Sequence, residues 1–250
     1  MNYIACCSFG KDSLATVILA KKNNEPLDAV VYSRVMFDKN RSAELPEHED
    51  FIFNIAIPKL ESWGIKTIVL DSPKTFVDCF FRVRSRGKNE GKIVGFPIPN
   101  RCEVQRDCKL PVFKKLNELY KKKDTIWYVG IAIDEQNRLE RLAGTNKISL
   151  LAKYGYTEQM AAELCKEEGL YSPIYSFTKR GGCFFCPNAS DSELYHLYSN
   201  HPKIWAELME LEKTQNRATD NKGKAKFNRS ETLTEINERF YHLKQALDKE

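Results

Sequence analysis

The chain lacks the long apolar run that a membrane-spanning helix requires. No stretch of roughly 18 consecutive apolar residues occurs among its 250 residues. Its first apolar run, Tyr3 to Cys7, is too short for a signal peptide and is not preceded by a basic segment. These absences exclude a helical membrane protein, and we expect a cytoplasmic protein without a membrane partner.

A strong excess of one charge and an internal repeat are also absent. The net charge is +5, and 42% of the residues are hydrophobic. This balance excludes a histone-like basic tail and is compatible with anionic ligands. A chain of this length suits one large domain, or one domain with a small appendage. We expect a domain over residues 1–190 and a helical extension over 191–250.

Strand-like and helix-like segments alternate along the first part of the chain. Hydrophobic spacing predicts strands at 2–7, 27–35, 65–70 and 125–133, and helices at 12–22, 47–62, 106–122 and 231–248. This alternation predicts an α/β fold with right-handed crossovers, a doubly wound parallel sheet and helices on both faces. Ligands of such folds bind beyond the carboxyl ends of the strands.

A polar segment, "SFGKDS" (8–13), separates the first predicted strand from the first predicted helix. The first N–H groups of a helix have no partner within it, and the helix dipole makes that end partly positive. An anion satisfies both, so this arrangement is a natural phosphate site. Gly10 lets the backbone approach a phosphate closely, Ser8 and Ser13 offer hydroxyls, and Lys11 offers a cation.

Asp12 has two interpretations: it caps the helix, or it helps to hold a magnesium ion near the phosphates. The alternative for the whole segment is that Ser8 or Asp12 caps a helix and binds nothing. The spacing of the Walker A loop between its glycine and its Gly-Lys-Ser/Thr is absent, which excludes that type of phosphate loop.

The chain has eight cysteines, which in a reducing compartment favour metal or redox chemistry over disulfides. Cys183 and Cys186 form a C-x-x-C in a glycine-flanked loop, and Cys102 and Cys108 lie upstream. Four thiolates suit a tetrahedral zinc ion or a [4Fe–4S] cluster, and ligand count does not choose between them. A C-x-x-C without metal is the remaining alternative. The other cysteines, Cys6, Cys7, Cys79 and Cys165, are interpreted as small core residues.

Charged residues follow the fourth predicted strand, where α/β sheets place substrate groups. Arg138 and Arg141 suit contact with a phosphate or sulfate, and Glu135 precedes them. The alternative is a solvated helix face with an ion pair three residues apart.

The connection between the third strand and the next helix is long and basic. Its cations are candidates for binding nucleic-acid phosphates, and interleaved aromatic rings permit stacking on bases; the cations are Arg82, Arg84, Arg86, Lys88 and Lys92, and the rings are Phe80, Phe81 and Phe96. The alternatives are a solvated loop and rings that anchor it to the core. A second polar segment, 215–230, is expected to be mobile.

Several segments, taken in order, resemble one family. "SFGKDS" resembles the PP-loop, SGGxDS, with Phe9 in place of the first glycine of the pair. "VVYSRVMFDKNRSAELPEH", "NRCEVQRDCKLPVFKKL" and "GIAIDEQNRLERL" resemble the family's later segments, although Ala132 stands where the family often has arginine. Over roughly residues 1–190 the chain resembles the PP-loop ATP pyrophosphatases and the phosphoadenosine phosphosulfate (PAPS) reductases, which share the Rossmann-like fold of the adenine nucleotide α-hydrolases.

The resemblance implies that ATP, with Mg²⁺, binds at the first strand–helix turn. It assigns nucleotide binding to Ser8, Phe9, Gly10, Lys11, Asp12, Ser13 and Gly130, and catalysis to Lys11, Asp12, Asp38, Glu135 and Arg138. Family members split ATP between its α- and β-phosphates and adenylate a substrate. Cluster-containing members have a tandem cysteine pair and a later C-x-x-C, whereas Cys102 and Cys108 are separated in this chain. The resemblance favours a [4Fe–4S] cluster on Cys102, Cys108, Cys183 and Cys186, with Zn²⁺ as the alternative.

The reductases of this family carry a C-terminal Glu-Cys-Gly-Leu-His motif, and this chain has no cysteine after Cys186. We therefore expect an enzyme that adenylates a substrate with release of pyrophosphate, coupled to sulfur transfer. The alternatives are a sulfonucleotide reductase that uses a partner's thiol, and a non-catalytic nucleotide- or metal-binding module of a larger assembly. Nucleic acid and a sulfur-donor or reductant protein are the candidate partners besides the nucleotide, and the oligomeric state stays open.

Overall fold

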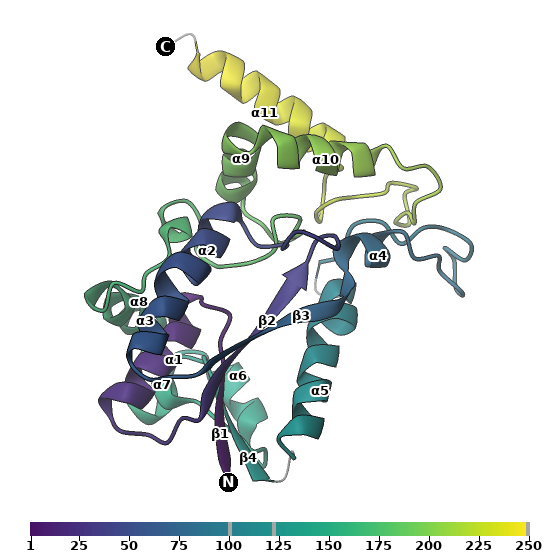
Figure 1. The fold of residues 1–250 in the computed structure, drawn as a ribbon. Coiled ribbons are helices and arrows are strands. Elements are labelled where there is room, and N and C mark those ends of the chain that lie inside the picture. The colour runs from purple at the N-terminus through teal and green to yellow at the C-terminus, as the bar shows by residue number, and fades with distance from the viewer. Residues whose placement is uncertain (100–101, 122–123, 249–250) are drawn as a thin grey trace. The chain divides into compact units, whose positions relative to one another are not determined.

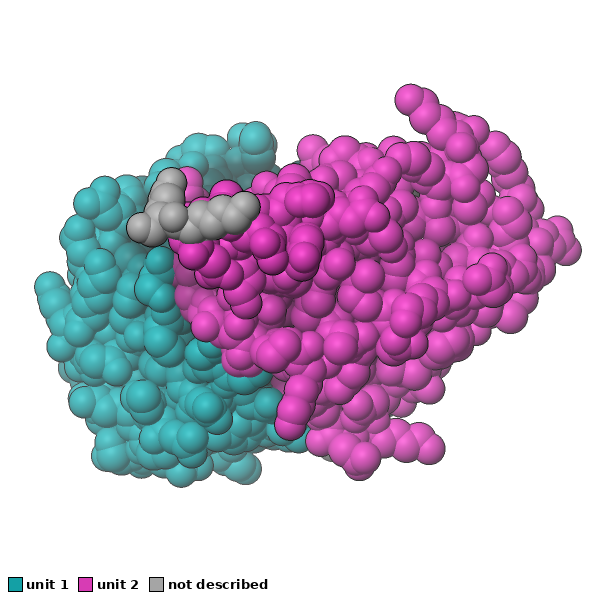
Figure 2. All heavy atoms as spheres, turned by 90° about the horizontal axis from the view of Figure 1, so that it is seen from above, with its two compact units in different colours: residues 1–34, 45–72, 109–176 teal, residues 35–44, 73–108, 177–250 magenta. Residues whose placement is uncertain are grey.

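The computed structural model describes residues 1–99, 102–121 and 124–248. The chain forms two compact units, which Figure 2 colours separately. Unit 1 comprises residues 1–34, 45–72 and 109–176, and unit 2 comprises residues 35–44, 73–108 and 177–250. These units are defined by contacts in space, whereas the division at residue 190 is a statement about chain order and stays a prediction.

A five-stranded sheet confirms the predicted fold class. Its strands are β1 (Asn2–Cys6), β2 (Ala29–Met36), β3 (Thr67–Thr75), β4 (Thr125–Val129) and β5 (Lys147–Ile148), in the order β3-β2-β1-β4-β5. The β1–β2, β1–β4 and β4–β5 pairs are parallel, with Ile4 opposite Ala29 on one side and Trp127 on the other. The order reverses direction at β1, and ligands of such sheets bind beyond the strand ends at that point.

Alternate residues of β1 face opposite sides of the sheet, as the two-residue period of a strand requires. Ala5 packs in a core with α1 (Lys11–Lys22), α7 (Leu150–Lys153) and α8 (Glu158–Glu167). Ile4 packs in a second core with Leu116 of α5 (Leu110–Leu119). Figure 1 shows α1, α7 and α8 on one face of the sheet and α5 on the other. Both faces are therefore covered, and the strands read as apolar runs.

Two predicted helices contain a π-helical turn that ends shortly before a proline. The helix predicted at 47–62 is α2 (Pro46–Phe51), a π-helical turn (Ile52–Ala56) and α3 (Ile57–Ser62), which contains Pro58. The helix predicted at 106–122 begins with a π-helical turn (Gln105–Lys109) before α5, which contains Pro111. Proline has no N–H to donate to the preceding turn. A wider turn at that point accommodates the missing bond without ending the helix.

Short helical segments connect β4, β5 and the end of unit 1. These are α6 (Gln136–Leu139) and the 3₁₀ turns Glu140–Leu142 and Pro173–Ser176. No helix among the described residues is long and apolar enough to cross a bilayer.

Unit 2 has a core of phenylalanines. Seven rings lie in contact with one another around α4 (Phe76–Phe80): Phe37, Phe76, Phe80, Phe96, Phe184, Phe185 and Phe227. Phe80 and Phe96 are buried, whereas Phe81 is 45% exposed. Two of the three rings proposed to stack on bases thus anchor the basic loop to the core.

Backbone hydrogen bonds join the basic loop to the segment expected to be mobile. Ile93 N donates to Asn216 O at 2.9 Å, and Ala218 N donates to Ile93 O at 2.7 Å. Within the loop, Arg84 N donates to Lys92 O at 2.9 Å. These bonds hold both segments in place in unit 2, because the main-chain N–H and C=O groups named here have partners within the protein. The unit ends in three packed helices, α9 (Asp191–Asn200), α10 (Pro202–Glu212) and α11 (Leu233–Leu247).

Candidate functional site

The loop between β1 and α1 depends on an unusual backbone conformation at Phe9. Its φ is +58°, in the left-handed region that favours glycine. The Phe9 ring is fully buried and packs edge-on against Tyr32 with the ring centroids 5.3 Å apart. This conformation gives a physical reason for the glycine that PP-loops usually have here. Burial of the ring offsets the strain of a side chain at this position.

The Ser13 hydroxyl closes the loop back on the first turn of α1. Its Oγ accepts a hydrogen bond from Ser8 N at 3.2 Å and donates to Gly10 O at 2.9 Å. The residue before the helix is Gly10, which has no side chain to cap it. The alternative in which Ser8 or Asp12 serves as the N-cap is therefore wrong.

Tyr175 and Glu158 accept hydrogen bonds from the backbone and side-chain nitrogens of Lys11, respectively. Lys11 N donates to Tyr175 Oη at 2.9 Å, and Lys11 Nζ lies 2.8 Å from Glu158 and 3.2 Å from Asp12. Burial acts to lower the pKa of Lys11, but the bond to Glu158 and the charge of Asp12 outweigh it, and its pKa is raised. Burial raises the pKa of Asp12 in spite of the opposing effect of Lys11. A phosphate at this turn would compete with Glu158 for the Lys11 ammonium.

His48, which sequence reasoning assigned no role, holds the loop from the side of α2. Its Nε2 lies 3.3 Å from Ser8 O, and its Nδ1 lies 2.9 Å from Ser172 Oγ. A carbonyl only accepts, so Nε2 donates to Ser8 O, while Nδ1 shares a hydrogen bond with the Ser172 hydroxyl. The imidazole thus connects the loop between β1 and α1 to Ser172. A histidine two residues after the helix-starting Pro46 gave no signal of this in the sequence.

Gly130 brings the end of β4 against the first turn of α1. A Cβ added to Gly130 would lie 2.7 Å from Asp12 C and 2.7 Å from Ser13 N. Real Cβ atoms do not approach backbone so closely, so only glycine fits here. Gly130, which the resemblance predicts to contact the nucleotide, therefore has a structural role beside Asp12 and Ser13.

A cavity of about 300 Å³ lies beyond the ends of β1 and β4. Its lining includes Ser8 from the loop, Ser13 from α1, Gly130 just after β4 and Arg138 from α6. This is the location expected for the ligand of a sheet whose order reverses at β1. The cavity brings together hydroxyls, a helix start and an arginine, which are the groups that bind phosphate.

Glu135 and Arg138 form the ion pair that the alternative interpretation described. Arg138 Nη1 donates to Glu135 Oε1, and Glu135 Oε2 accepts from Ala132 N at 3.1 Å. Arg138 nevertheless lines the cavity and is half exposed, so it remains available to an anion. Arg138 thus forms an ion pair with Glu135 and also faces the cavity. Catalytic roles for the two residues stay predictions.

Asp38 belongs to unit 2, in the segment after β2. Its Oδ1 accepts hydrogen bonds from Asn40 N at 2.8 Å and Arg41 N at 2.9 Å, which stabilise a turn. Its proposed place near the nucleotide or metal stays a prediction.

The cysteines predicted to bind metal all lie in unit 2, together with a fifth, Cys79. Cys79 and Cys108 are buried, and their sulfur atoms are 3.7 Å apart. Their hydrogen bond lowers the pKa of Cys79 and, with burial, raises the pKa of Cys108. The charge of Cys183 also raises the pKa of Cys108. The interpretation of Cys79 as a core residue missed this contact, because nothing in the local sequence indicates it.

The C-x-x-C forms a tight turn. Cys186 N donates to Cys183 O at 2.9 Å, and Cys186 Sγ accepts from Arg180 Nη2 at 2.8 Å. Cys102, whose carbonyl accepts from Arg106 N at 3.4 Å, is half-buried. These cysteines form no disulfide bond among the described residues. A set of thiols in one unit is a donor set that fits zinc or an iron–sulfur cluster.

The remaining cysteines behave as the core residues that the sequence predicts. Burial raises the pKa of Cys6 to about 12, that of Cys7 to about 11 and that of Cys165 to about 12. Burial of these thiols agrees with the core role that the sequence predicts for them.

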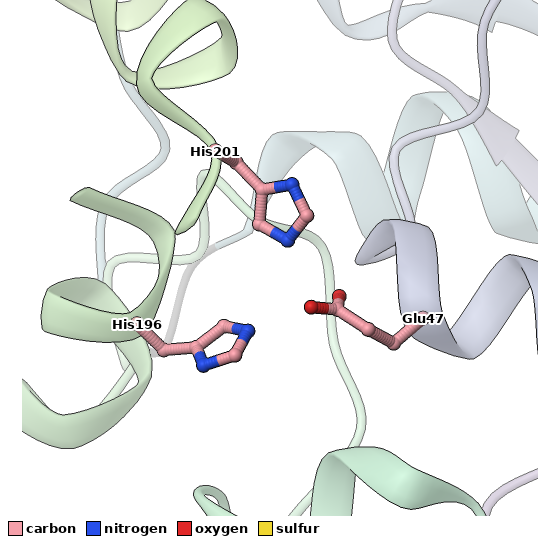
Figure 3. Close-up of side chains that lie close together, drawn as sticks. All are labelled: Glu47, His196 and His201. Carbon is pink, nitrogen blue, oxygen red and sulfur yellow. The ribbon is translucent and has the colours of Figure 1, made fainter. Parts of the chain in front are cut away.

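Two histidines of unit 2 lie close together. Figure 3 shows His196 from α9 and His201 at the start of α10, and their ring centroids are 5.7 Å apart. His196 also stacks on Phe177 with a centroid separation of 3.6 Å. Sequence reasoning assigned neither residue a role as ligand, and stacking accounts for the position of the His196 ring.

Comparison with models of known protein families and with curated protein sequences gives no match. Among solved structures, the chain is similar to the U34-tRNA thiolase NcsA from Methanococcus maripaludis with its [4Fe–4S] cluster. The two share 14% sequence identity and a TM-score of 0.46, over 97% of this chain and 72% of the thiolase chain. A likeness of this degree concerns the course of the backbone and transfers no residue roles.

Proposed function

We propose that the chain is a PP-loop enzyme that binds ATP and adenylates a substrate with release of pyrophosphate. The observation that carries this proposal is the cavity beyond β1 and β4, with Ser8, Ser13 and Arg138 in its wall. It adjoins the start of α1, where the N-cap Gly10 has no side chain, although Tyr175 Oη accepts a hydrogen bond from Lys11 N. A helix start is an anion site because the helix dipole is positive there and the first N–H groups have no partner within the helix.

The residues around the cavity have distinct parts in this reaction. The hydroxyls of Ser8 and Ser13 and the first amides of α1 bind phosphate oxygens. Lys11 exchanges Glu158 for the phosphates and neutralises charge that develops on the leaving pyrophosphate. Asp12 holds the magnesium ion that ATP brings. An oxygen of the acceptor attacks the α-phosphorus, and the bond to the β-phosphate oxygen breaks. Arg138 orients the acceptor or the α-phosphate from the opposite wall.

The cysteine set of unit 2 is proposed as a thiolate metal centre, with a [4Fe–4S] cluster as first choice and zinc as the alternative. Five thiols among the described residues lie in this unit, and two of them are in direct contact. A cluster with one exchangeable iron site would carry the sulfur that replaces the adenylate. The protein supplies the ligands and the buried, hydrogen-bonded surroundings that tune such a centre.

Nucleic acid is the acceptor class that we propose. Unit 2 contains a second cavity of about 390 Å³, lined by five cations: Arg84, Arg217, Lys224, Lys226 and Arg229. Its other wall includes Phe96 and Pro97, and Asp220 is the acidic residue of the lining. Cations beside apolar surface bind phosphate groups and the faces of bases together.

The test is the fate of ATP labelled at its α-phosphate. The protein is incubated anaerobically with Mg²⁺, this ATP and either bulk tRNA or DNA oligonucleotides. We expect labelled AMP or adenylated acceptor together with pyrophosphate. Lys11→Ala should lower the rate roughly 10- to 100-fold, because a charge-assisted hydrogen bond contributes about 1.5–3 kcal/mol.

Lys22→Ala is the matched control, since Lys22 lies at the other end of the same helix and pairs with Glu168. It should leave the rate unchanged. Full pyrophosphate release by Lys11→Ala would remove the proposed role of the lysine. Production of ADP and phosphate would show cleavage between the β- and γ-phosphates, which contradicts the proposed adenylation. Sulfite release from adenylyl sulfate with a thiol donor would instead favour a sulfonucleotide reductase.

A further inference from the structure

We propose that Cys79 is a ligand of the metal centre, together with Cys108, Cys183 and Cys186. This inference deepens the proposed metal centre and does not depend on the ATP chemistry. It changes the ligand set that the sequence suggests, because Cys79 takes the position given to Cys102.

The first argument is the spacing of two sulfur atoms. Cys79 Sγ and Cys108 Sγ are 3.7 Å apart. Two thiolates on one tetrahedral ion, each about 2.3 Å from it, lie about 3.8 Å apart. The pair therefore already has the separation of two corners of a tetrahedral site. It reaches this separation although the two residues lie 29 positions apart in the chain.

The second argument is the direction in which α4 presents Cys79. Phe76 and Cys79 are three residues apart on this helix and lie on the same side of it. The Phe76 ring stacks on Phe185 with centroids 3.7 Å apart. Phe185 lies between Cys183 and Cys186. The side of α4 that carries Cys79 is thus the side that packs against the C-x-x-C loop.

The third argument is that both segments are held firmly. Thr75 and Asp78 form a reciprocal cap at the start of α4, and Val77 N donates to Phe37 O at 3.0 Å. On the loop side, Phe184 N donates to Ala43 O at 2.9 Å, and Cys183 pairs with Glu44. Ligands on fixed backbone bind metal with little loss of entropy.

The count of ligands completes the assignment. Cys79, Cys108 and the two cysteines of the tight turn supply four thiolates, which is the full set of one tetrahedral zinc ion. A site with four thiolates needs no fifth. Cys102, six residues before Cys108, is therefore expected to be dispensable for metal binding.

The experiment measures iron and zinc in the anaerobically purified full chain and in single serine variants. Iron and zinc are quantified by mass spectrometry, and iron–sulfur loading is followed by visible absorption after reconstitution with iron and sulfide. Cys79→Ser and Cys108→Ser should lose most of the bound metal. Cys102→Ser should retain it, as should the control Cys165→Ser, which removes a buried thiol of unit 1.

Cobalt substitution keeps the proposal testable where a variant binds metal weakly. Intensity of the thiolate-to-cobalt charge-transfer band scales with the number of thiolates. It should fall by about a quarter in folded Cys79→Ser, from four sulfur ligands to three. It should not change in Cys102→Ser.

Full metal content and unchanged cobalt absorption in Cys79→Ser would overturn the assignment, as would their loss in Cys102→Ser. A Cys79–Cys108 disulfide in metal-loaded protein would overturn it as well. None of these readouts uses ATP. A failure of the adenylation chemistry would therefore leave the ligand assignment standing, and the reverse also holds.

Discussion

Single backbone positions shape the loop between β1 and α1. Phe9 adopts a φ of +58°, where the PP-loops that this segment resembles have glycine, and Gly130 leaves no room for a Cβ beside Asp12 and Ser13. The sequence identified both residues as members of the candidate site. It did not indicate why each is there, because the reason is a close approach between segments that are far apart in the chain.

Gly130→Ala is expected to destabilise the protein and weaken nucleotide binding. The added methyl would clash with backbone, which cannot move as a flexible side chain does, and overpacking of this kind costs about 1–3 kcal/mol. For a chain of this size the melting temperature should fall by roughly 2–12 °C. Thermal unfolding monitored by circular dichroism, with and without ATP and Mg²⁺, provides the measurement.

Gly182→Ala is the matched control. A Cβ at Gly182 would meet only the end of the Arg180 side chain, at 3.7 Å. Its melting temperature and ATP response should stay close to those of the unchanged protein. Equal stability of the two variants would contradict the close approach at Gly130.

At the scale of elements, two features were not visible in the sequence: the π-helical turns before prolines and a buried carboxyl group at the start of α9. The π-helical turns before Pro58 and Pro111 were not predicted. The start of α9 has a feature that periodicity does not reveal. Glu193, in its first turn, is only 3% exposed, and its Oε1 has no hydrogen-bond partner among the described residues.

Glu193→Gln should stabilise the protein at neutral pH. Burial raises the pKa of Glu193 above its ordinary value of 4.5, with Thr178 and Arg180 opposing the shift. A carboxyl whose pKa is raised on folding contributes most at low pH, and that contribution is lost as the pH rises through the folded-state pKa. Glutamine carries no charge, so the variant avoids this loss.

Melting temperatures of the two proteins should be measured from pH 4 to pH 8. The advantage of the variant should grow with pH and disappear toward the acidic end. A variant that is less stable than the parent at pH 7 would show that the charged carboxylate is stabilised in its site.

At the scale of the whole molecule, a small net charge coexists with a local cluster of cations. The chain carries +5 overall, yet five cations line one cavity of unit 2. Four of them pair with acids: Arg84 with Glu103, Arg217 with Glu212, Lys224 with Glu235 and Lys226 with Asp220. Nucleic-acid phosphates would have to compete with these acids. We therefore expect binding that is moderate and sensitive to salt.

Binding of a fluorescent single-stranded oligonucleotide should weaken linearly with the logarithm of salt concentration. Arg229→Ala should reduce the slope by about 0.7, the contribution of one phosphate contact on a single strand. Fluorescence anisotropy over a salt series measures this. Lys213→Ala is the control, because Lys213 is highly exposed and does not line the cavity. Identical slopes for Arg229→Ala and the parent would remove the cavity from the proposed interface.

Much of the fold followed from the sequence because it depends on short-range patterns. Apolar runs interrupted by amphipathic helices predict a parallel sheet wherever they occur, and a polar segment between strand and helix predicts an anion site. The C-x-x-C is equally local. These features need only neighbours a few residues apart, and the structure confirms the sheet and the strand–loop–helix start.

Only the tertiary structure decided which distant side chains meet. The contact of Cys79 with Cys108 spans 29 residues, and those of Lys11 with Tyr175 and with Glu158 span 164 and 147. No periodicity encodes such pairs, because they depend on the order in which strands join the sheet and on how loops return to it. The sequence by itself therefore determined the architecture, while packing decided which distant side chains lie together at the candidate site.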